Sequence, residues 1–118
     1  MVENLYNERI LKLAASLSKV GRIESAEFSS QAISRLCGSK VTVDLDISKN
    51  TVKSFSHIVK ACALGQASSS VMAENIIGTD IFELLDLKAK MRGMLKDDGS
   101  PPSGKWSDLE VLQPVRDY

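Results

Sequence analysis

Two cysteines, Cys37 and Cys62, are the residues of this sequence whose chemistry could serve a function. Cys62 lies between residues 52–61, which read as a strand, and a helix rich in small residues. A thiol at a helix N-terminus feels the positive end of the macrodipole, which favours the thiolate, the form that binds metals and attacks sulfur. Cys37 is predicted to end another strand and is followed by Gly38. Two thiols at two strand ends could converge in space.

Spacing alone does not identify a metal site around these thiols. Paired C-x-x-C motifs, H-E-x-x-H helices, calcium loops and phosphate-binding glycine loops are all absent from the sequence. Zinc and iron–sulfur sites usually have four ligands, and two thiols do not complete one. Ser39 adds a hydroxyl oxygen, a weaker ligand than a carboxylate. The alternative is that both cysteines are structural, because free cysteine packs as a small hydrophobic residue.

His57 is a further ligand candidate, and we weigh it against a structural role. It is the single histidine of the chain and falls on the same face of its predicted strand as Phe55 and Val59. That position favours an ordinary packed histidine over a metal ligand. A serine hydrolase is disfavoured as well, because residues 68–70 (SSS) belong to a different predicted element from the only candidate base.

Length and composition indicate one globular domain with no net charge. The chain has 118 residues, 43% hydrophobic and 25% charged, and its 15 basic residues balance 15 acidic ones. This balance predicts binding to neither nucleic acid nor an anionic membrane. Glu3, Glu8 and Arg9 interrupt any secretory signal, and no apolar run approaches the ~18 residues of a membrane span. We therefore expect a cytoplasmic protein.

Hydrophobic periodicity predicts an α+β fold: a three-stranded antiparallel sheet with an N-terminal helix and C-terminal helices packed on it. The expected strands are 26–36, 41–47 and 52–61, with a turn at 48–50 in which Asn50 tolerates positive φ. Helices are expected at 4–17 and 63–77. Short links between successive strands favour an antiparallel meander.

The C-terminal third is predicted to be helical, with one loop. Gly78 ends the preceding helix, and Thr79 or Asp80 caps the next one. Residues 97–104 read as a loop, and Ser107 with Glu110 predicts a short capped helix that Pro114 ends or restarts. The apolar stripe of the helix that begins after Thr79 or Asp80 is assigned to Ile81, Leu84, Leu85, Met91 and Leu95. Because the sequence stops on a newly opened apolar segment, we expect residues 1–118 to be a single domain that lacks its C-terminal segment.

With these elements in place, the sequence resembles the NifU/IscU-type iron–sulfur cluster assembly scaffolds. The order of helix, three strands and helices agrees, and the resemblance spans most of the chain. Residues 79–105 resemble the insertion of the SufU-like branch, and residues 112–116 (LQPVR) resemble the segment ahead of that branch's third cysteine. The residues that carry the resemblance are Cys37, Gly38, Ser39, Cys62 and the run 67–74 (ASSSVMAE).

The resemblance implies a scaffold and not an enzyme. In this family a cysteine desulfurase supplies sulfur, iron joins it, and a 2Fe–2S cluster is built and passed to acceptor proteins. Cys37 and Cys62 match two of the family's three cysteine ligands, whereas Ser39 stands at its acidic position and no third cysteine follows. The chaperone-recognition motif of the IscU-like branch is absent too. A homo-oligomer is left open.

Two alternatives accompany the scaffold interpretation. In the SufU-like branch the same site holds zinc, and a cysteine accepts persulfide sulfur, so this chain could be a zinc-dependent sulfur acceptor for a cysteine desulfurase. It could also be a divergent binding module without a cluster, in which the two thiols are structural. A working scaffold needs further ligands close to Cys37 and Cys62, and this requirement separates the alternatives.

Overall fold

The computed structural model describes residues 8–33, 38–97 and 99–117 and has the predicted α+β architecture. Along the described residues, a helix precedes three strands, and further helices follow them. The elements are α2 (Glu8–Ala15), β1 (Phe28–Ile33), β2 (Lys40–Ser48), β3 (Thr51–Lys60), α3 (Ala63–Asn75), α4 (Ile81–Lys96) and a 3₁₀ helix, η1 (Gly104–Asp117). Within the described residues, no helix is both long and apolar enough to cross a membrane.

The three strands form one antiparallel sheet in the order β1-β2-β3. Lys49 and Asn50 make the β2–β3 turn with φ values of 52° and 62°, the backbone of a two-residue hairpin loop whose twist matches the strands. This confirms the predicted turn and the last two predicted strands. The first is shorter than predicted, since β1 begins at Phe28, and residues 34–36 lie outside the described residues.

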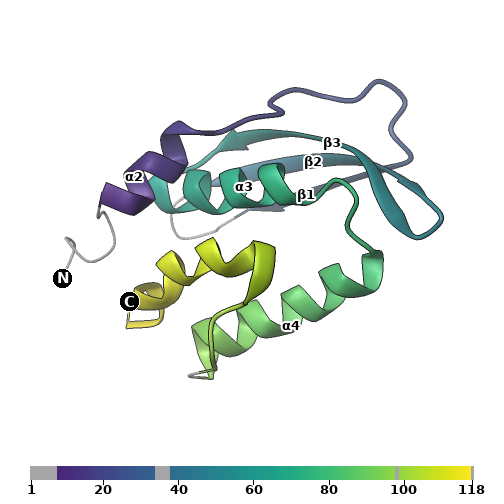
Figure 1. Ribbon diagram of the computed structural model, residues 1–118. Coiled ribbons are helices and arrows are strands. Elements are labelled where there is room, and N and C mark those ends of the chain that lie inside the picture. Colours follow the sequence, from purple (N-terminus) through teal and green to yellow (C-terminus); the bar gives the residue numbers. More distant parts are fainter. Residues whose placement is uncertain (1–7, 34–37, 98, 118) are drawn as a thin grey trace.

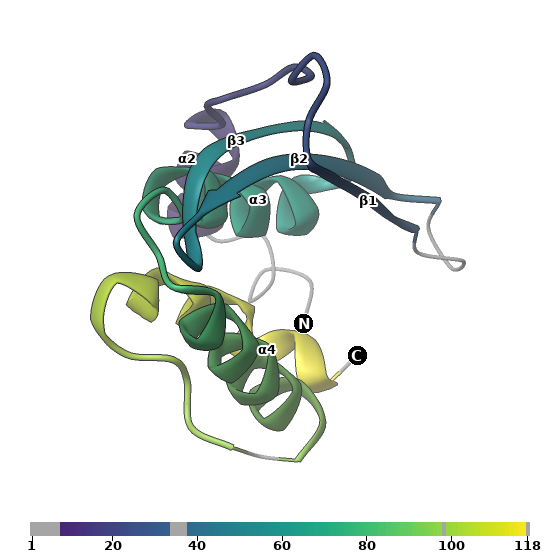
Figure 2. The same ribbon diagram turned by 90° about the vertical axis from the view of Figure 1, so that its right-hand side faces the viewer.

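The helices lie on one face of the sheet, which we call the inner face (Figures 1 and 2). Helices α2 and α3 run side by side next to the sheet, and α4 with η1 forms a further layer beyond them. The segment between α2 and β1 passes over the opposite, outer face. The buried apolar residues are Ile10, Val52, Phe55, Ala67, Val71, Ala73, Ile76, Leu87, Met94, Trp106, Leu109, Val111 and Leu112.

Small residues let α3 pack closely, and a glycine and an aspartate mark the break that follows it. Ala67, Ser70 and Ala73 are each at most 1% exposed, which supports a packing role for the serine run. Gly78 follows with φ of 86°, a left-handed conformation that favours glycine. Asp80 then caps α4, its Oδ1 accepting a hydrogen bond from the Phe82 N–H at 2.7 Å. The predicted helix break and the Asp80 cap are confirmed.

The apolar stripe of α4 differs from the predicted one. Leu87 and Met94 are 5% and 0% exposed, although neither was assigned to the stripe, whereas Leu85 is 61% exposed. The spacing Leu84, Leu87, Met91, Met94 follows the three- and four-residue steps that keep side chains on one helix face. Leu85 lies about 100° away from Leu84 around the helix axis and points off that face.

The first and last helices of the described residues have different limits from the predicted ones. The predicted capping box at Ser107 is wrong, because η1 begins at Gly104, whose φ is 67°, and continues through Pro114. Trp106, 5% exposed, anchors the start of η1, and its indole N–H donates to Glu83 Oε2 at 2.9 Å. Helix α2 ends at Ala15, before the predicted limit, and residues 4–7 lie outside the described residues.

Candidate functional site at the β3–α3 junction

Cys62 lies between the end of β3 and the first turn of α3. It is the N-cap residue, with extended backbone angles (φ −68°, ψ 175°), and its carbonyl accepts the first helical hydrogen bond from the Gln66 N–H at 2.9 Å. The side chain makes no capping hydrogen bond, and the residue is exposed. The thiol is therefore available to a ligand or a partner from solvent.

Two contacts fix the backbone around this thiol. The Gln66 side chain turns back and donates from Nε2 to the Ala61 carbonyl at 2.9 Å. Gly65 packs so closely on Ala61 that a β carbon on the glycine would lie 2.6 Å from the Ala61 Cβ. The backbone before Cys62 and the first turn of the helix after it are thus in direct contact, and this contact sets the position of the thiol.

The sheet register brings the start of β2 to the same end of the sheet. Lys40 is the partner of Lys60 in the antiparallel β2–β3 pair, so the residues just before Lys40 and just after Lys60 lie beside each other. Gly38, with φ of 72°, leads into β2, and Ser39 there is partly buried. Cys37 lies outside the described residues, and the convergence of the two thiols stays a prediction.

His57 is a core residue. It is 1% exposed, and its ring meets Phe55 edge-on with the ring centres 4.9 Å apart. Nε2 lies 2.7 Å from the Ser18 carbonyl oxygen; because a carbonyl only accepts, Nε2 carries the proton. This agrees with the packed histidine that the strand pattern favours. In the part of the chain that the structure describes, no three His, Cys, Asp or Glu residues are grouped to hold a metal ion.

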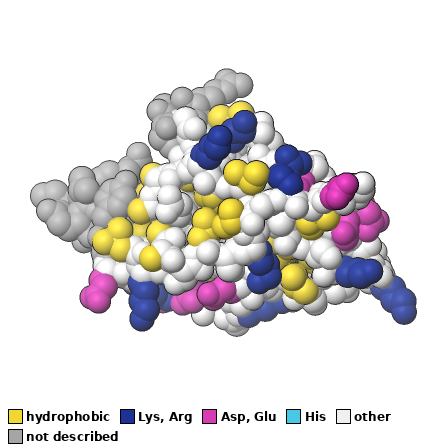
Figure 3. Space-filling model, turned by 90° about the horizontal axis from the view of Figure 1, so that it is seen from above, with side chains coloured by type: hydrophobic (Ala, Val, Ile, Leu, Met, Phe, Trp, Pro, Cys, Tyr) yellow, Lys and Arg dark blue, Asp and Glu magenta, His cyan; other side chains and the backbone are white. Residues whose placement is uncertain are grey.

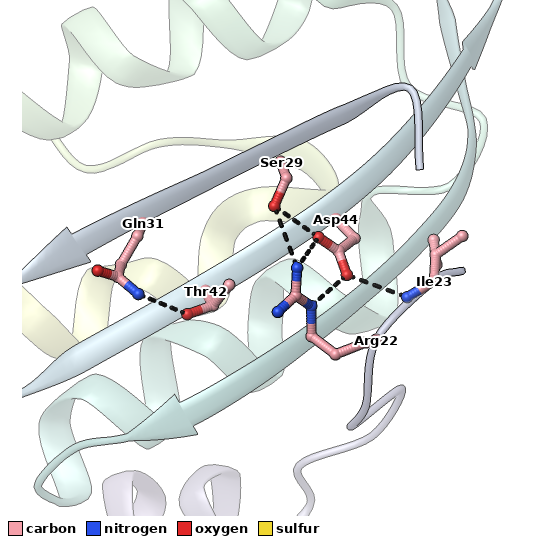
Figure 4. A network of polar contacts seen from close by, with 6 residues as sticks. All are labelled: Arg22, Ile23, Ser29, Gln31, Thr42 and Asp44. Carbon is pink, nitrogen blue, oxygen red and sulfur yellow. Dashed lines mark hydrogen bonds and ion pairs between the residues drawn. The ribbon is translucent and has the colours of Figure 1, made fainter. Parts of the chain in front are cut away.

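A buried ion pair on the outer face was missed by the sequence analysis. Asp44 alternates with the apolar residues of β2 and so lies on the outer face, yet it is 0% exposed because the segment after α2 covers it (Figure 4). Arg22 donates from Nε to Asp44 Oδ2 at 2.6 Å and from Nη2 to Oδ1 at 3.1 Å. The Ser29 hydroxyl and the Ile23 N–H donate to the same carboxylate at 2.7 and 3.0 Å.

These donors make Asp44 a structural carboxylate. The hydrogen bonds from Arg22, and then those from Ser29 and Ile23, hold the pKa of Asp44 well below its usual value and outweigh the opposing effect of desolvation. The pair ties the segment after α2 to β2. Arg22 and Asp44 are far apart in sequence, and no local pattern in the sequence indicates that they meet.

A large apolar cavity lies away from Cys62. It measures about 670 Å³ and is lined on one side by the inner face of the sheet and α3, and on the other by α4. Its lining is largely apolar and includes Val43, Phe55, Met72 and Leu84. The polar and thiol chemistry of the β3–α3 junction is therefore distinct from this apolar space.

Comparison with known proteins connects this geometry to one family. A family model described as the NifU-like N-terminal domain matches residues 5–103. The iron–sulfur cluster assembly scaffold protein IscU of Thermotoga maritima is 30% identical, in an alignment that covers 97% of this chain and 80% of the relative.

Solved structures have the same fold. The N-terminal part of a nitrogen-fixing NifU-like protein from Brucella abortus superposes with a TM-score of 0.95 at 44% identity, covering 99% of this chain and 81% of that one. A scaffold protein for the SUF system from Fervidobacterium islandicum gives a TM-score of 0.88 at 23% identity, covering 100% of this chain and 86% of that one. At that identity, the second likeness shows the fold alone.

Proposed function

The chain belongs to the NifU-like N-terminal domain family, and on that premise we propose that it is a scaffold on which an iron–sulfur cluster is assembled and from which the cluster is transferred to acceptor proteins. The observation that carries the proposal is the exposed Cys62 thiol at the β3–α3 junction of a domain of this family. Scaffolds of this family hold and pass on their cargo without catalysing a reaction, so the protein is not an enzyme.

Cys37 and Cys62 are the proposed ligands of the cargo. Thiolates are the soft ligands that iron–sulfur chemistry requires. Support comes from the β2–β3 register, which puts Gly38 and Ser39, the two residues after Cys37, at the same end of the sheet as Cys62. Ser39 is at most an auxiliary ligand, because its neutral hydroxyl supplies no charge to iron.

Iron and sulfide are substrates in this scheme. A cysteine desulfurase is the proposed sulfur donor, and iron–sulfur acceptor proteins are the proposed recipients, with a 2Fe–2S cluster as the assembled product. Free, reduced thiols are the usual state of cysteines in the cytoplasm, which is the proposed location. An open position for Cys62 suits this role, because both the donor and the recipient must reach the same thiol.

The test is the iron and acid-labile sulfide content of anaerobically reconstituted protein. Wild-type protein is expected to retain iron and sulfide in equal amounts, and Cys37→Ser and Cys62→Ser are each expected to lose both. Ser69→Ala, in the helix that Cys62 caps, is the control and is expected to retain both. Ser39→Asp is expected to increase iron retention, because a carboxylate adds a charged oxygen ligand.

Three results would contradict the proposal. Equal iron content in the wild type and in both cysteine variants would show that neither thiol is an iron ligand. If the wild type binds zinc without sulfide and the cysteine variants lose the zinc, the protein would be a zinc-dependent sulfur acceptor and not a cluster scaffold. Binding of neither metal would favour a divergent module in which the thiols are structural.

A further inference from the structure

Two lysines face each other on the outer face of the sheet, at the end nearest Cys62. Lys40 on β2 is the register partner of Lys60 on β3, and both are exposed. Directly opposite residues of antiparallel strands lie on the same face with β carbons about 4.5–5.5 Å apart, where like charges destabilise the sheet. Alternation along β2 puts Lys40 on the side of Thr42 and Asp44, which is the outer face.

The lysines border a shallow polar pocket of about 200 Å³. Its other lining residues are Arg22, Gln31, Thr42 and Ile58. Arg22 is already bound to Asp44, and Gln31 donates from Nε2 to Thr42 Oγ1 at 3.2 Å (Figure 4). By contrast, neither lysine takes part in any ion pair formed within residues 8–33, 38–97 and 99–117. Among the described residues, the pocket therefore has two cations without a paired carboxylate.

An apolar side chain lies next to these cations. Ile33 on β1 is the register partner of Lys40, so it belongs to the same outer face, and it is 60% exposed. Figure 3, which looks onto the outer face, shows Lys and Arg side chains at several places on this surface, with hydrophobic side chains among them. A combination of apolar and cationic groups on an open surface is characteristic of a protein interface.

We propose that the Lys40–Lys60 pocket is a docking site for a carboxylate-rich segment of a partner protein that works on the Cys62 thiol. Each exposed ammonium contributes little alone, since exposed ion pairs are worth about 0–1 kcal/mol, so a single small anion is held weakly. A segment with several carboxylates engages both lysines and covers Ile33 at once. The lysines also steer an acidic partner toward the thiol end of the sheet.

The docking site rests on the proposed function in one respect, the identity of the partner, which is the sulfur donor. Lys60 precedes Cys62 by one intervening residue, and Lys40 follows Ser39 directly. A protein that docks on this pocket therefore has the thiol within reach. The repulsion between the two facing lysines makes the free domain less stable than it would be without them. We therefore attribute this pair of lysines to binding.

The test uses a fluorescein-labelled peptide of sequence Glu-Leu-Glu-Leu-Glu-Leu and fluorescence anisotropy. Lys40→Gln and Lys60→Gln are each expected to weaken binding about twofold to fivefold, and the double variant about tenfold. Lys53→Gln is the matched control, since it removes the same charge from β3 about 23 Å along the strand, and it is expected to bind like the wild type. The peptide with Gln in place of Glu is expected not to bind.

A second measurement separates docking from a purely structural role. Lys60→Glu puts opposite charges face to face, so it is expected to raise the melting temperature at low salt while abolishing peptide binding. Equal peptide affinity for the Lys40, Lys60 and Lys53 variants would overturn the proposal. Displacement of the peptide by inorganic phosphate at an ionic strength well below that at which sodium chloride displaces it would also overturn the proposal. The pocket would then be a site for small anions.

The two proposals fail separately. Weaker peptide binding by the Lys60→Gln variant does not depend on iron, because the anisotropy experiment uses the protein without cargo. If peptide binding follows the lysines but neither cysteine variant loses iron, the docking site stands and the scaffold assignment fails. If iron retention follows the cysteines but the lysine variants bind the peptide normally, only the docking site fails.

Discussion

Gly65 of α3 lies against Ala61 at the end of β3, with no room between them for a further side chain. A β carbon on Gly65 would be 2.6 Å from the Ala61 Cβ, nearer than non-bonded carbons pack, so helix or strand would have to move. Cys62 lies between the two residues in the sequence and would move with them. The glycine therefore links the packing of the domain to the position of the thiol.

Replacing Gly65 by alanine is expected to destabilise the domain. Overpacking of this kind typically costs about 1–3 kcal/mol, which outweighs the roughly 1 kcal/mol by which alanine favours a helix. The free energy of unfolding in urea measures the effect. Gly93→Ala in α4 is the control: its β carbon meets nothing within 4 Å, and we expect it to raise stability by about 0.5–1 kcal/mol. Stabilisation by both substitutions would contradict the close contact at Gly65.

Asp44 is expected to make the stability of the domain depend on pH in the acid range. Arg22 and Ser29 lower the pKa of this carboxyl in the folded protein from the value of 3.8 that the unfolded chain has. Stability from the carboxylate is therefore fully present above pH 3.8 and is lost as pH falls below it toward the folded pKa. Asp44→Asn should be less stable than the wild type at neutral pH, and the difference should shrink in acid.

Urea unfolding midpoints of both proteins, measured from about pH 7 to about pH 3, test this expectation. Asp86→Asn is the control, because Asp86 is exposed on α4 and, among the described residues, forms an ion pair only with the exposed Lys90. Its difference from the wild type is expected to be small throughout. A gap between wild type and Asp44→Asn that stays constant over the range would show that Asp44 gains nothing from ionisation in the folded state.

Local patterns in the sequence were sufficient for the elements near the site. The alternation in residues 41–47 predicted β2, because apolar residues on one face of a strand must be buried. Asp80 predicted the start of α4, because its side chain satisfies a free N–H there. Cys62 was correctly assigned to a helix N-terminus, since the small-residue run begins directly after it. All of these depend on neighbours within a few residues.

The features that were missed depend on distant parts of the chain. Asp44 is buried by the segment before β1, whose Arg22 is 22 residues earlier in the sequence, and no periodicity reveals this contact. The Lys40–Lys60 pair depends on a shift of register between Asp46 and Ile47, where β2 and β3 slip by one residue. Without that bulge, counting back from the Lys49–Asn50 turn would pair Lys40 with Val59. Hence the register had to be seen in the structure.

Leu87 and Leu85 are expected to differ sharply, because the structure buries the first and exposes the second. Leu87 is 5% exposed and Leu85 is 61% exposed, although they lie on the same helix. Leu87→Ala should lower the free energy of unfolding by about 2–5 kcal/mol, and Leu85→Ala should change it by less than about 0.5 kcal/mol. Chemical denaturation of the two variants measures both values. Equal losses would mean that the face of α4 assigned to the core is wrong.

His57 and Cys62 should separate folding from cargo binding. His57→Leu leaves the Ser18 carbonyl without its donor and removes the ring contact with Phe55, so we expect a loss of about 1–3 kcal/mol in unfolding free energy. Iron retention per folded molecule should be unchanged, because the buried imidazole is held by the core. Cys62→Ser should do the reverse, losing iron while its stability stays within about 0.5 kcal/mol of the wild type, since the thiol is exposed.

The pair of measurements for this prediction is urea unfolding and iron content of reconstituted protein, made on both variants and on the wild type. Iron content is normalised to the folded fraction, so that instability of His57→Leu does not count as lost binding. Loss of iron from folded His57→Leu would make the histidine a ligand and would require its ring to leave the Ser18 carbonyl. Loss of stability in Cys62→Ser would instead make the thiol part of the packing at the β3–α3 junction.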